Sequence, residues 1–296
     1  MLLFPRHCTL RSIISATVRG GIFESAAQAV DHLGRDVPLD GYLGECAHQV
    51  GLRFFQSDEA GRILLRHHSH IGLFGNLLAD DDEDDLRDGL IDGDSNAIAR
   101  ARALRAQGPL ESDTLRRCPQ CVDDDLANYG LAHWRLYHQW PIAQHCVIHG
   151  CELQDRCAHC GSQIWRGASL ALPHDSCERW GRAEFVGTGS AQVPIYEQTL
   201  RRLHSMLVGC VPSMRPERRA ATALHAKRAL YGHMHLGGLI GFACAQWNCA
   251  SVAELAQKFG CVESDEMLDD VGDIEAPDSL PAILVTAVAT AVHENV

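Results

Sequence analysis

Six cysteine and histidine residues in the middle of the chain form three short pairs, each with two residues between its members. The pairs are Cys118 with Cys121, Cys146 with His149, and Cys157 with Cys160. This spacing lets both side chains of a pair face one ion, and thiolate with imidazole is a donor mixture that tetrahedral zinc prefers. We therefore expect zinc ligands here, rather than disulfide bonds or merely buried thiols.

The pairs combine into two predicted ligand sets. The sets are Cys118, Cys121, Cys146 and His149 for the first, and Cys157, Cys160, His174 and Cys177 for the second. The second set is weaker, because Trp180 stands where a further CxxC pair would need a cysteine. Spacing alone also allows the two CxxC pairs to share one ion, which would leave Cys146 and His149 elsewhere. We expect one to two structural zinc ions.

Nothing in the sequence predicts catalysis at these ions. A catalytic zinc keeps an open position for water, whereas the first set is closed by four ligands. Asp123–Asp125 lies near Cys121 without a partner motif, and the histidines of His67–His70 are most simply a packed or solvated cluster. Phosphate-binding, nucleophile-elbow and HExxH motifs are missing from the sequence. We expect no enzyme, although a zinc hydrolase stays open as an alternative class.

Composition bounds the class of protein. The chain has 296 residues, 46% of them hydrophobic, and 13 cysteines, which fits a globular protein with a real core. The start of the chain does not resemble a signal peptide, and the apolar run Leu280–Val292 is short of the roughly 20 residues that span a bilayer. We therefore expect a cytoplasmic protein without membrane contact, whose reduced thiols are available for metal.

The charge is unevenly distributed. The net charge of -12 argues against nonspecific coating of DNA. Asp80–Asp94 and Glu254–Val296 are strongly acidic, whereas Arg116–Arg228 has a small excess of bases. Only the middle of the chain suits phosphate or an acidic partner, and the basic residues predicted for such contact are Arg201, Arg202, Arg218 and Arg219.

The flanking regions have helical patterns. In the N-terminal part, apolar spacing predicts helices over 23–33 and 40–50, ended by Gly34 and Gly51. Two short helices around a turn fit a helix-turn-helix, and they fit a small bundle equally well. We expect the acidic block Asp80–Asp85 to be a solvated loop and 96–106 to be a helix.

Further helices are expected in the metal-binding part and after it. Aromatic residues at helical spacing over 131–140 predict a helix that packs against the zinc site, rather than a platform for stacking bases. Helices are also expected over 199–207, 218–231 and 252–260. A following helix, Glu263–Asp270, is acidic and therefore suits a protein partner better than DNA.

These patterns predict a mainly α fold with small, zinc-ribbon-like finger modules between helical N-terminal and C-terminal regions. The expected domains are a helical, helix-turn-helix-like domain over 1–115, a tandem zinc-finger module over 116–185, and a helical domain with an acidic tail over 186–296.

The central motifs resemble the TniQ/TnsD family of transposition target-selection proteins. The resemblance rests on the CPxC pair at Cys118, the WRLxHQxP run from Trp134 to Pro141, the CxxHG run at Cys146 and the CxxCG run at Cys157. The segment Leu10–Ser12 with the helix after it is similar to the start of that family.

This resemblance implies a non-enzymatic adaptor in DNA transposition. Such a protein couples a target-recognition complex, in some systems an RNA-guided CRISPR effector, to an AAA+ transposition ATPase at the target DNA. Some members of the family are homodimers. The alternative that stays open is a zinc-containing helix-turn-helix regulator that binds DNA directly.

Overall fold

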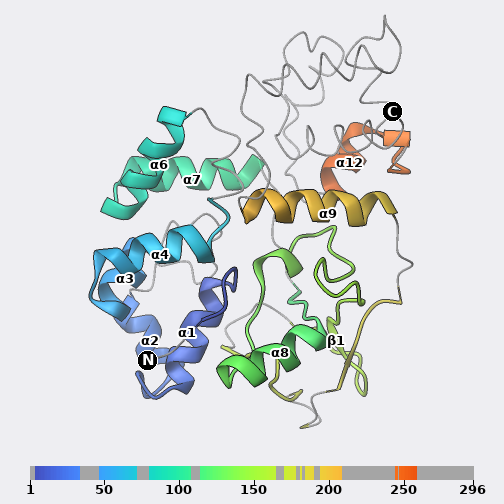
Figure 1. The fold of residues 1–296 in the computed structure, drawn as a ribbon, viewed down its shortest axis with the longest axis horizontal. Helices are drawn as coiled ribbons and strands as arrows, with labels where there is room; N and C mark the ends of the chain where they lie inside the picture. The colour runs from blue at the N-terminus through green and yellow to red at the C-terminus, as the bar shows by residue number, and fades with distance from the viewer. Residues whose placement is uncertain are drawn as a thin grey trace, which may run out of the picture.

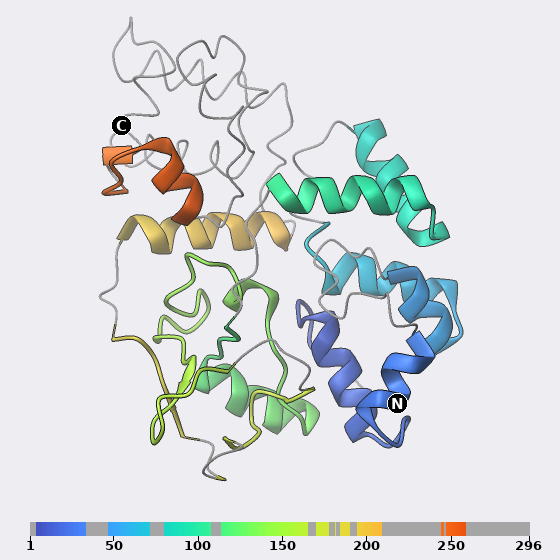
Figure 2. The same cartoon turned by 180° about the vertical axis from the view of Figure 1, so that it is seen from behind.

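The computed structural model describes most of the chain up to Lys258 (Figures 1 and 2). The described residues are 4–33, 47–71, 80–107, 114–164, 170–177, 181, 184–189, 194–208, 244–245 and 247–258. Helices dominate them, which confirms the predicted mainly α class. No helix among them has the length and apolar character needed to cross a membrane.

The N-terminal region is a group of short helices. They are α1 (Leu10–Arg19), α2 (Ala26–Leu33), α3 (Ala47–Phe55) and α4 (Asp58–His68). Side chains cap two of them: the hydroxyl of Thr9 accepts the Ser12 N–H at 3.2 Å at the start of α1, and Ser57 accepts the Ala60 N–H at 3.3 Å at the start of α4. Such caps satisfy backbone donors that the first helical turn leaves unpaired.

Helices α2 and α3 lie at the two segments for which the sequence predicted helices, 23–33 and 40–50, whereas the tight pairing of α3 with α4 was not predicted. Residues 40–46 of the predicted 40–50 helix lie outside the described part, and α3 continues past Gly51 to Phe55. The prediction that Gly51 ends the helix was wrong. Gly51 instead allows α3 and α4 to approach closely, because a Cβ at this position would lie 2.5 Å from the backbone nitrogen of Gly61 in α4.

Two helices in contact with each other follow, α6 (Asp80–Asp92) and α7 (Ser95–Gln107) (Figure 1). Helix α7 confirms the predicted helix over 96–106, and Asp94 caps it by accepting the Ala97 N–H at 2.8 Å. The acidic block Asp80–Asp85 is the first turn and a half of α6, so the loop prediction was wrong. Negative charge is favourable at a helix N-terminus, and the buried side chains of Leu86 and Leu90 anchor the helix in the core.

The metal-binding part contains little regular structure. It has α8 (Pro119–Tyr129), the 3₁₀ turn η1 (Leu136–His138), and the paired strands β1 (Arg156–Cys157) and β2 (Phe185–Val186). The helix predicted over 131–140 is wrong. The backbone there pairs with the N-terminal segment instead: Thr9 N–H donates to Trp134 O at 2.7 Å, and Leu136 N–H donates to His7 O at 2.8 Å.

The predicted packing role of the aromatic residues in this segment is nevertheless correct. Trp134 and Trp140 are fully buried. The indole N–H of Trp140 donates to Nε2 of His70 at 2.8 Å, and the backbone N–H of Trp134 donates to the hydroxyl of Ser12 at 2.8 Å. These bonds join the N-terminal helices to the metal-binding part. They also show that the histidine cluster at 67–70 is packed, because His68 and His70 are buried.

Two helices cover the other side of the metal-binding part. Helix α9 (Pro194–Leu207) contains the predicted 199–207 segment and lies along the loops that follow α8, with α12 (Val252–Lys258) above it (Figures 1 and 2). Tyr196 of α9 stacks on Trp247, with ring centroids 4.7 Å apart. The helices predicted over 218–231 and 263–270 lie outside the described residues.

One hydrophobic cluster connects these parts. It runs from Cys8 and α1 through Trp140 to Leu200 of α9 and Leu255 of α12. Shared core of this kind means that the metal-binding loops are held between two helical regions (Figure 1). The expected boundaries near 115 and 185 stay a prediction.

Candidate metal centre

The first ligand pair lies at the start of α8. Cys118 is the N-cap, and its sulfur accepts the backbone N–H of Cys121 at 3.3 Å, while Pro119 supplies a first helical residue that needs no hydrogen-bond partner. Both thiols therefore face the N-terminal end of a helix. The partial positive charge there stabilises thiolates, the form that binds metal.

The second pair lies on a tight turn, the first knuckle (residues 146–151). The N–H of Gly150 donates to the Cys146 carbonyl at 2.7 Å, and the N–H of Cys146 donates to the Cys151 carbonyl at 2.8 Å. Gly150 has φ of +69°, a left-handed conformation that glycine adopts without strain. This turn directs the side chains of Cys146 and His149 toward α8.

The four side chains of the first set meet in one place. One donor atom from each of Cys118, Cys121, Cys146 and His149 lies within 4.8 Å of the others. The sulfurs of Cys121 and Cys146 are 3.8 Å apart, the separation that two sulfurs about 2.3 Å from one tetrahedral zinc would have. His149 Nδ1 is 3.3 Å from the sulfurs of Cys118 and Cys121 and 3.7 Å from that of Cys146.

The donor chemistry of the first set fits zinc. Hydrogen bonds from the thiols of Cys118 and Cys121 hold the pKa of Cys146 well below its usual range, and hydrogen bonds with Cys121 and Cys146 raise the pKa of Cys118. A divalent ion would take the place of the thiol protons, since a coordinating thiol is deprotonated.

Two neighbours of the first set could tune it. The Nε2 of His138 lies 3.4 Å from the Cys146 sulfur, and the Asp124 carboxylate lies 3.3 Å from Nε2 of His149. A carboxylate behind a ligating histidine fixes its tautomer and raises its basicity. Sequence reasoning missed both residues. A usable signal existed for Asp124, which lies three residues after Cys121 and hence on the same face of α8.

A buried charge pair holds the loop after α8. The Asp125 carboxylate is 1% exposed and accepts hydrogen bonds from the guanidinium of Arg135 and from the His133 N–H at 3.0 Å. This pairing satisfies the carboxylate inside the core. The acidic run Asp123–Asp125 is thus divided between the metal centre and the framework around it.

The second set has the same local design. Its second knuckle (residues 157–162) has Gly161 at φ of +67°, with its N–H donating to the Cys157 carbonyl at 2.9 Å. The structure brings Cys157, Cys160 and Cys177 together, with the Cys160 and Cys177 sulfurs 3.7 Å apart. Hydrogen bonds from the side chain and backbone of Ser162 lower the pKa of Cys160 to about 7.

The structure does not bring His174 into this group. Its Nδ1 accepts the backbone N–H of Ala132 at 3.2 Å, and the turn around it is closed by the Leu172 N–H, which donates to Asp175 at 2.7 Å. The described residues therefore supply three thiols, and Trp180 with its neighbours at 178–179 lies outside them. Three thiolates suit zinc, with one position left for a further ligand.

The alternative in which the two CxxC pairs share one ion is not the arrangement observed. Cys118 and Cys121 meet Cys146 and His149, whereas Cys157 and Cys160 meet Cys177. The two knuckles therefore serve separate sites. Each site combines one knuckle with cysteines supplied from elsewhere in the chain.

The predicted contact arginines are only partly described. Arg201 is exposed on α9 and pairs with Glu197 one turn earlier, while Arg202 is half-buried, which lowers its pKa. Arg218 and Arg219 lie outside the described residues. A second basic surface, which the sequence did not suggest, is formed by Arg62 and Arg66 on α4.

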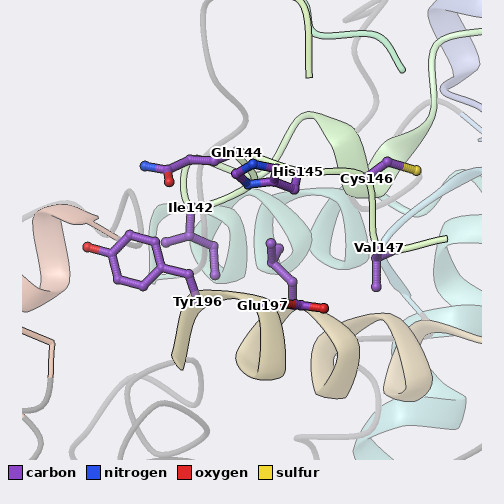
Figure 3. A pocket seen from close by; sticks show the side chains of 8 residues that line it. Ile142, Gln144, His145, Cys146, Val147, Tyr196 and Glu197 are labelled. Atoms are coloured by element: carbon purple, nitrogen blue, oxygen red, sulfur yellow. The ribbon is translucent and has the colours of Figure 1, made fainter. Parts of the chain in front are cut away.

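Two clefts accompany these surfaces. One lies between the first knuckle and α9, and Figure 3 shows Ile142 and Tyr196 lining it while the Cys146 sulfur points away from α9. It holds ≈ 10 Å³, about the room for a single water. The other holds ≈ 530 Å³ and is lined by Glu59, Arg62, Ile63, Arg66, His67, Ile71, Arg87 and Ile91 of α4, α6 and the residues near them.

One known protein family matches the part of the chain that contains the first candidate metal centre. The TniQ family model matches residues 67–153, from the end of α4 to the close of the first knuckle. The matched segment contains all four residues of the first ligand set. The resemblance to this family that the central motifs predicted is thus confirmed for this part of the chain. No curated protein matches the chain.

Proposed function

We propose that this protein is a non-enzymatic adaptor in DNA transposition. It would couple a target-recognition complex to an AAA+ transposition ATPase. The observation that carries this proposal is the TniQ match over residues 67–153, which contains all four residues of the first candidate ligand set. The match therefore falls on the part of the described structure that a zinc ion would hold together.

The form of the first metal centre supports a scaffolding role. The four protein donors that meet here would complete the tetrahedral shell of a zinc ion, with no position left for a reacting water. The cleft beside Cys146 has room for about one water and none for a substrate. Zinc at this centre would supply rigidity, holding the start of α8 against the first knuckle.

Rigidity is useful to an adaptor because its two partners must be held in a fixed relation. The first knuckle packs beneath α9, and Trp140 and Trp134 of the same region bind the N-terminal helices. The α4 face with Arg62 and Arg66 and the α9 face with Arg201 therefore lie on two regions joined through one core. Charged surfaces of this kind steer association with partners of opposite charge.

The proposed partners follow from the adaptor role. They are the AAA+ ATPase of the transposon, a target-recognition complex such as an RNA-guided CRISPR effector, and target DNA. We further propose a cytoplasmic location and a second copy of the chain as a partner in a homodimer. The proposed domains are those of the sequence prediction: 1–115, 116–185 and 186–296.

Reconstitution tests the adaptor proposal directly. The purified chain, an AAA+ transposition ATPase and a target-bound recognition complex are mixed in pairs and all together, and assembly is followed by size-exclusion chromatography with light scattering. We expect a ternary assembly that forms only when this chain is present. Assembly of the other two components without it would contradict the adaptor role, as would hydrolysis of nucleotide or DNA by the chain alone.

A second candidate function is a helix-turn-helix regulator that binds DNA itself. The observation that favours it is the α3–α4 pair, whose second helix presents Arg62 and Arg66. A mobility shift of short duplexes by the purified chain distinguishes the two. From the net charge of -12 we expect only weak, salt-sensitive binding, whereas sub-nanomolar affinity at physiological salt would favour the regulator.

A further inference from the structure

A fourth thiol, that of Cys151, lies against the three thiols and one imidazole of the first candidate metal centre. The sulfur of Cys151 is 3.1 Å from that of Cys118, closer than the 3.8 Å between Cys121 and Cys146 within the ligand set. Cys151 does not belong to the group of four donors that face one another. It is therefore a thiol that would stay uncoordinated when the centre holds zinc, in contact with one that would not.

The first knuckle fixes Cys151 in this position. Its carbonyl accepts the Cys146 N–H at 2.8 Å, directly after the left-handed Gly150. Cys118 is equally fixed, because its sulfur caps α8. The contact between the two sulfurs thus follows from two backbone arrangements rather than from a mobile side chain.

Accessibility differs across the pair. Cys118 is fully buried, whereas Cys151 is partly exposed. An oxidant arriving from solvent therefore reaches Cys151 first. Thiols that are oxidised reversibly are typically accessible and lie next to a second cysteine that resolves the first oxidation product.

We propose that Cys118 and Cys151 form a peroxide-sensitive pair that opens the first metal centre. The Cys151 thiolate attacks one oxygen of hydrogen peroxide, the O–O bond breaks, and Cys151 becomes a sulfenic acid as hydroxide leaves. The Cys118 sulfur then attacks the sulfenic sulfur, which forms the disulfide and releases a second hydroxide. Because Cys118 would be a metal-bound thiolate, only the Cys151 thiol supplies a proton; the products are one disulfide, one water and one hydroxide that takes a proton from solvent, and peroxide is the species reduced.

The disulfide removes a ligand from zinc. Only Cys121, Cys146 and His149 remain, and the cap at the start of α8 is lost with the Cys118 thiolate. Zinc affinity then falls and the helix loosens from the knuckle. Reduction by a dithiol reverses the step, because thiol–disulfide exchange restores both thiols. This inference does not depend on the adaptor role.

The second knuckle supplies an internal comparison. It places Ser162 one residue after its glycine, where the first knuckle has Cys151, and its backbone closes in the same way, with the Cys157 N–H donating to the Ser162 carbonyl at 2.9 Å. Serine is thus compatible with this turn. Cys151→Ser is therefore the variant that removes the reactive sulfur and retains the knuckle.

The test uses the zinc-loaded full chain exposed to a small molar excess of hydrogen peroxide. Released zinc is followed with a colorimetric chelator, and disulfides are mapped by mass spectrometry of peptides digested without reduction. Three proteins are compared: wild type, Cys151→Ser, and Cys244→Ala as a control that removes a buried cysteine outside both metal centres. Zinc content before treatment is measured for each.

We expect the wild type and the control to release zinc together with a peptide linking Cys118 to Cys151, and to regain zinc binding after dithiothreitol. Cys151→Ser should start with the wild-type zinc content and release zinc several-fold more slowly. The proposal is overturned if the wild-type linkage joins Cys118 to Cys121 or Cys121 to Cys146. It is also overturned if Cys151→Ser releases zinc at the wild-type rate, or lacks zinc from the outset, which would make Cys151 a ligand.

Discussion

Polar contacts from neighbouring side chains position two members of the first ligand set, His149 and Cys146. His149 faces the three thiols with Nδ1 and the Asp124 carboxylate with Nε2, so one ring joins the ligand set to α8 a second time. His138 approaches the Cys146 sulfur from the core side. None of these contacts could be derived from pair spacing, because spacing identifies the donors and says nothing of what lies behind them.

Removal of the Asp124 carboxylate should weaken zinc binding. Asp124→Ala takes away the acceptor behind His149, and changes of this kind typically cost about 10- to 100-fold in metal affinity. Competition with a chelator of known affinity measures the effect. Asp123→Ala is the matched control, because the Asp123 carboxylate is adjacent in sequence but is not the one that contacts His149. Equal affinity of the two variants would show that Asp124 plays no part in holding the metal.

A buried histidine should make the stability depend on pH. Burial lowers the pKa of His68 to about 4, although its ring donates to the Cys8 carbonyl at 3.1 Å, and its neighbours His67, His7 and His133 lower it further. The ordinary pKa of histidine is about 6.5. Between about pH 4 and 6.5, His68 is therefore protonated in the unfolded chain and neutral in the folded chain. Stability is therefore fully present above about pH 6.5 and is lost as the pH falls toward 4.

The expected contribution of His68 is up to about 1.4 kcal/mol of unfolding free energy for each pH unit in that window. Urea unfolding at pH 7, 6 and 5 measures it. In His68→Gln the dependence on pH should be shallower than in the wild type by about this amount, while Glu59→Gln on the exposed face of α4 should match the wild type. Parallel pH profiles for all three proteins would count against this assignment.

At the scale of elements, the structure of some segments follows from their own sequence, and that of others from contacts with segments distant in the chain. Local pattern predicted the helix over 96–106 and the cysteine pair at the start of α8, because apolar period and ligand spacing are properties of the segment itself. It failed for 131–140, where the backbone pairs with residues near Thr9, and for Asp80–Asp85, where the buried Leu86 and Leu90 anchor a helix. Those outcomes depend on partners distant in sequence.

The effect of a side chain at Gly51 also depends on a partner distant in sequence, Gly61, and substitution of Gly51 tests this. Alanine would ordinarily stabilise a helix by about 0.5–1 kcal/mol relative to glycine. Here the added Cβ would lie 2.5 Å from the Gly61 nitrogen, so α3 and α4 must separate. We expect Gly51→Ala to lower the free energy of unfolding by about 1–3 kcal/mol. Chemical denaturation measures it, and a stabilised variant would mean that the two helices do not approach so closely.

At the scale of the whole molecule, the first candidate metal centre is part of a shared core. Trp134 and Trp140 lie in the metal-binding part and bond to Ser12 and His70 of the N-terminal region, and the hydrophobic cluster continues to α12. The sequence predicted the four side chains that meet in the first candidate centre, and it predicted the resemblance to the matched family. It did not predict this integration, since nothing in a local pattern states which surfaces bury one another.

Removal of the metal should consequently reduce local stability in helices that contain none of its ligands. Chelation of zinc should reduce amide-exchange protection in α1 as well as in α8, because α1 bonds to Trp134 in the loop that follows α8. Hydrogen exchange with mass spectrometry compares the protein with and without zinc, and α7 serves as the internal control. Loss of protection confined to α8 and the knuckles would indicate that the metal-binding part behaves independently.

The zinc content of the purified full chain, with and without an intact first ligand set, is the most direct measurement. Elemental analysis should find one to two zinc ions per wild-type chain. Cys146→Ser should bind one ion fewer and unfold the start of α8, because structural zinc contributes about 10–16 kcal/mol of binding free energy in small finger domains. Cys249→Ser, which changes a cysteine outside both sets, should retain the wild-type count. A wild-type chain that carries no zinc, or a Cys146→Ser chain with an undiminished count, would contradict a structural zinc held by Cys118, Cys121, Cys146 and His149.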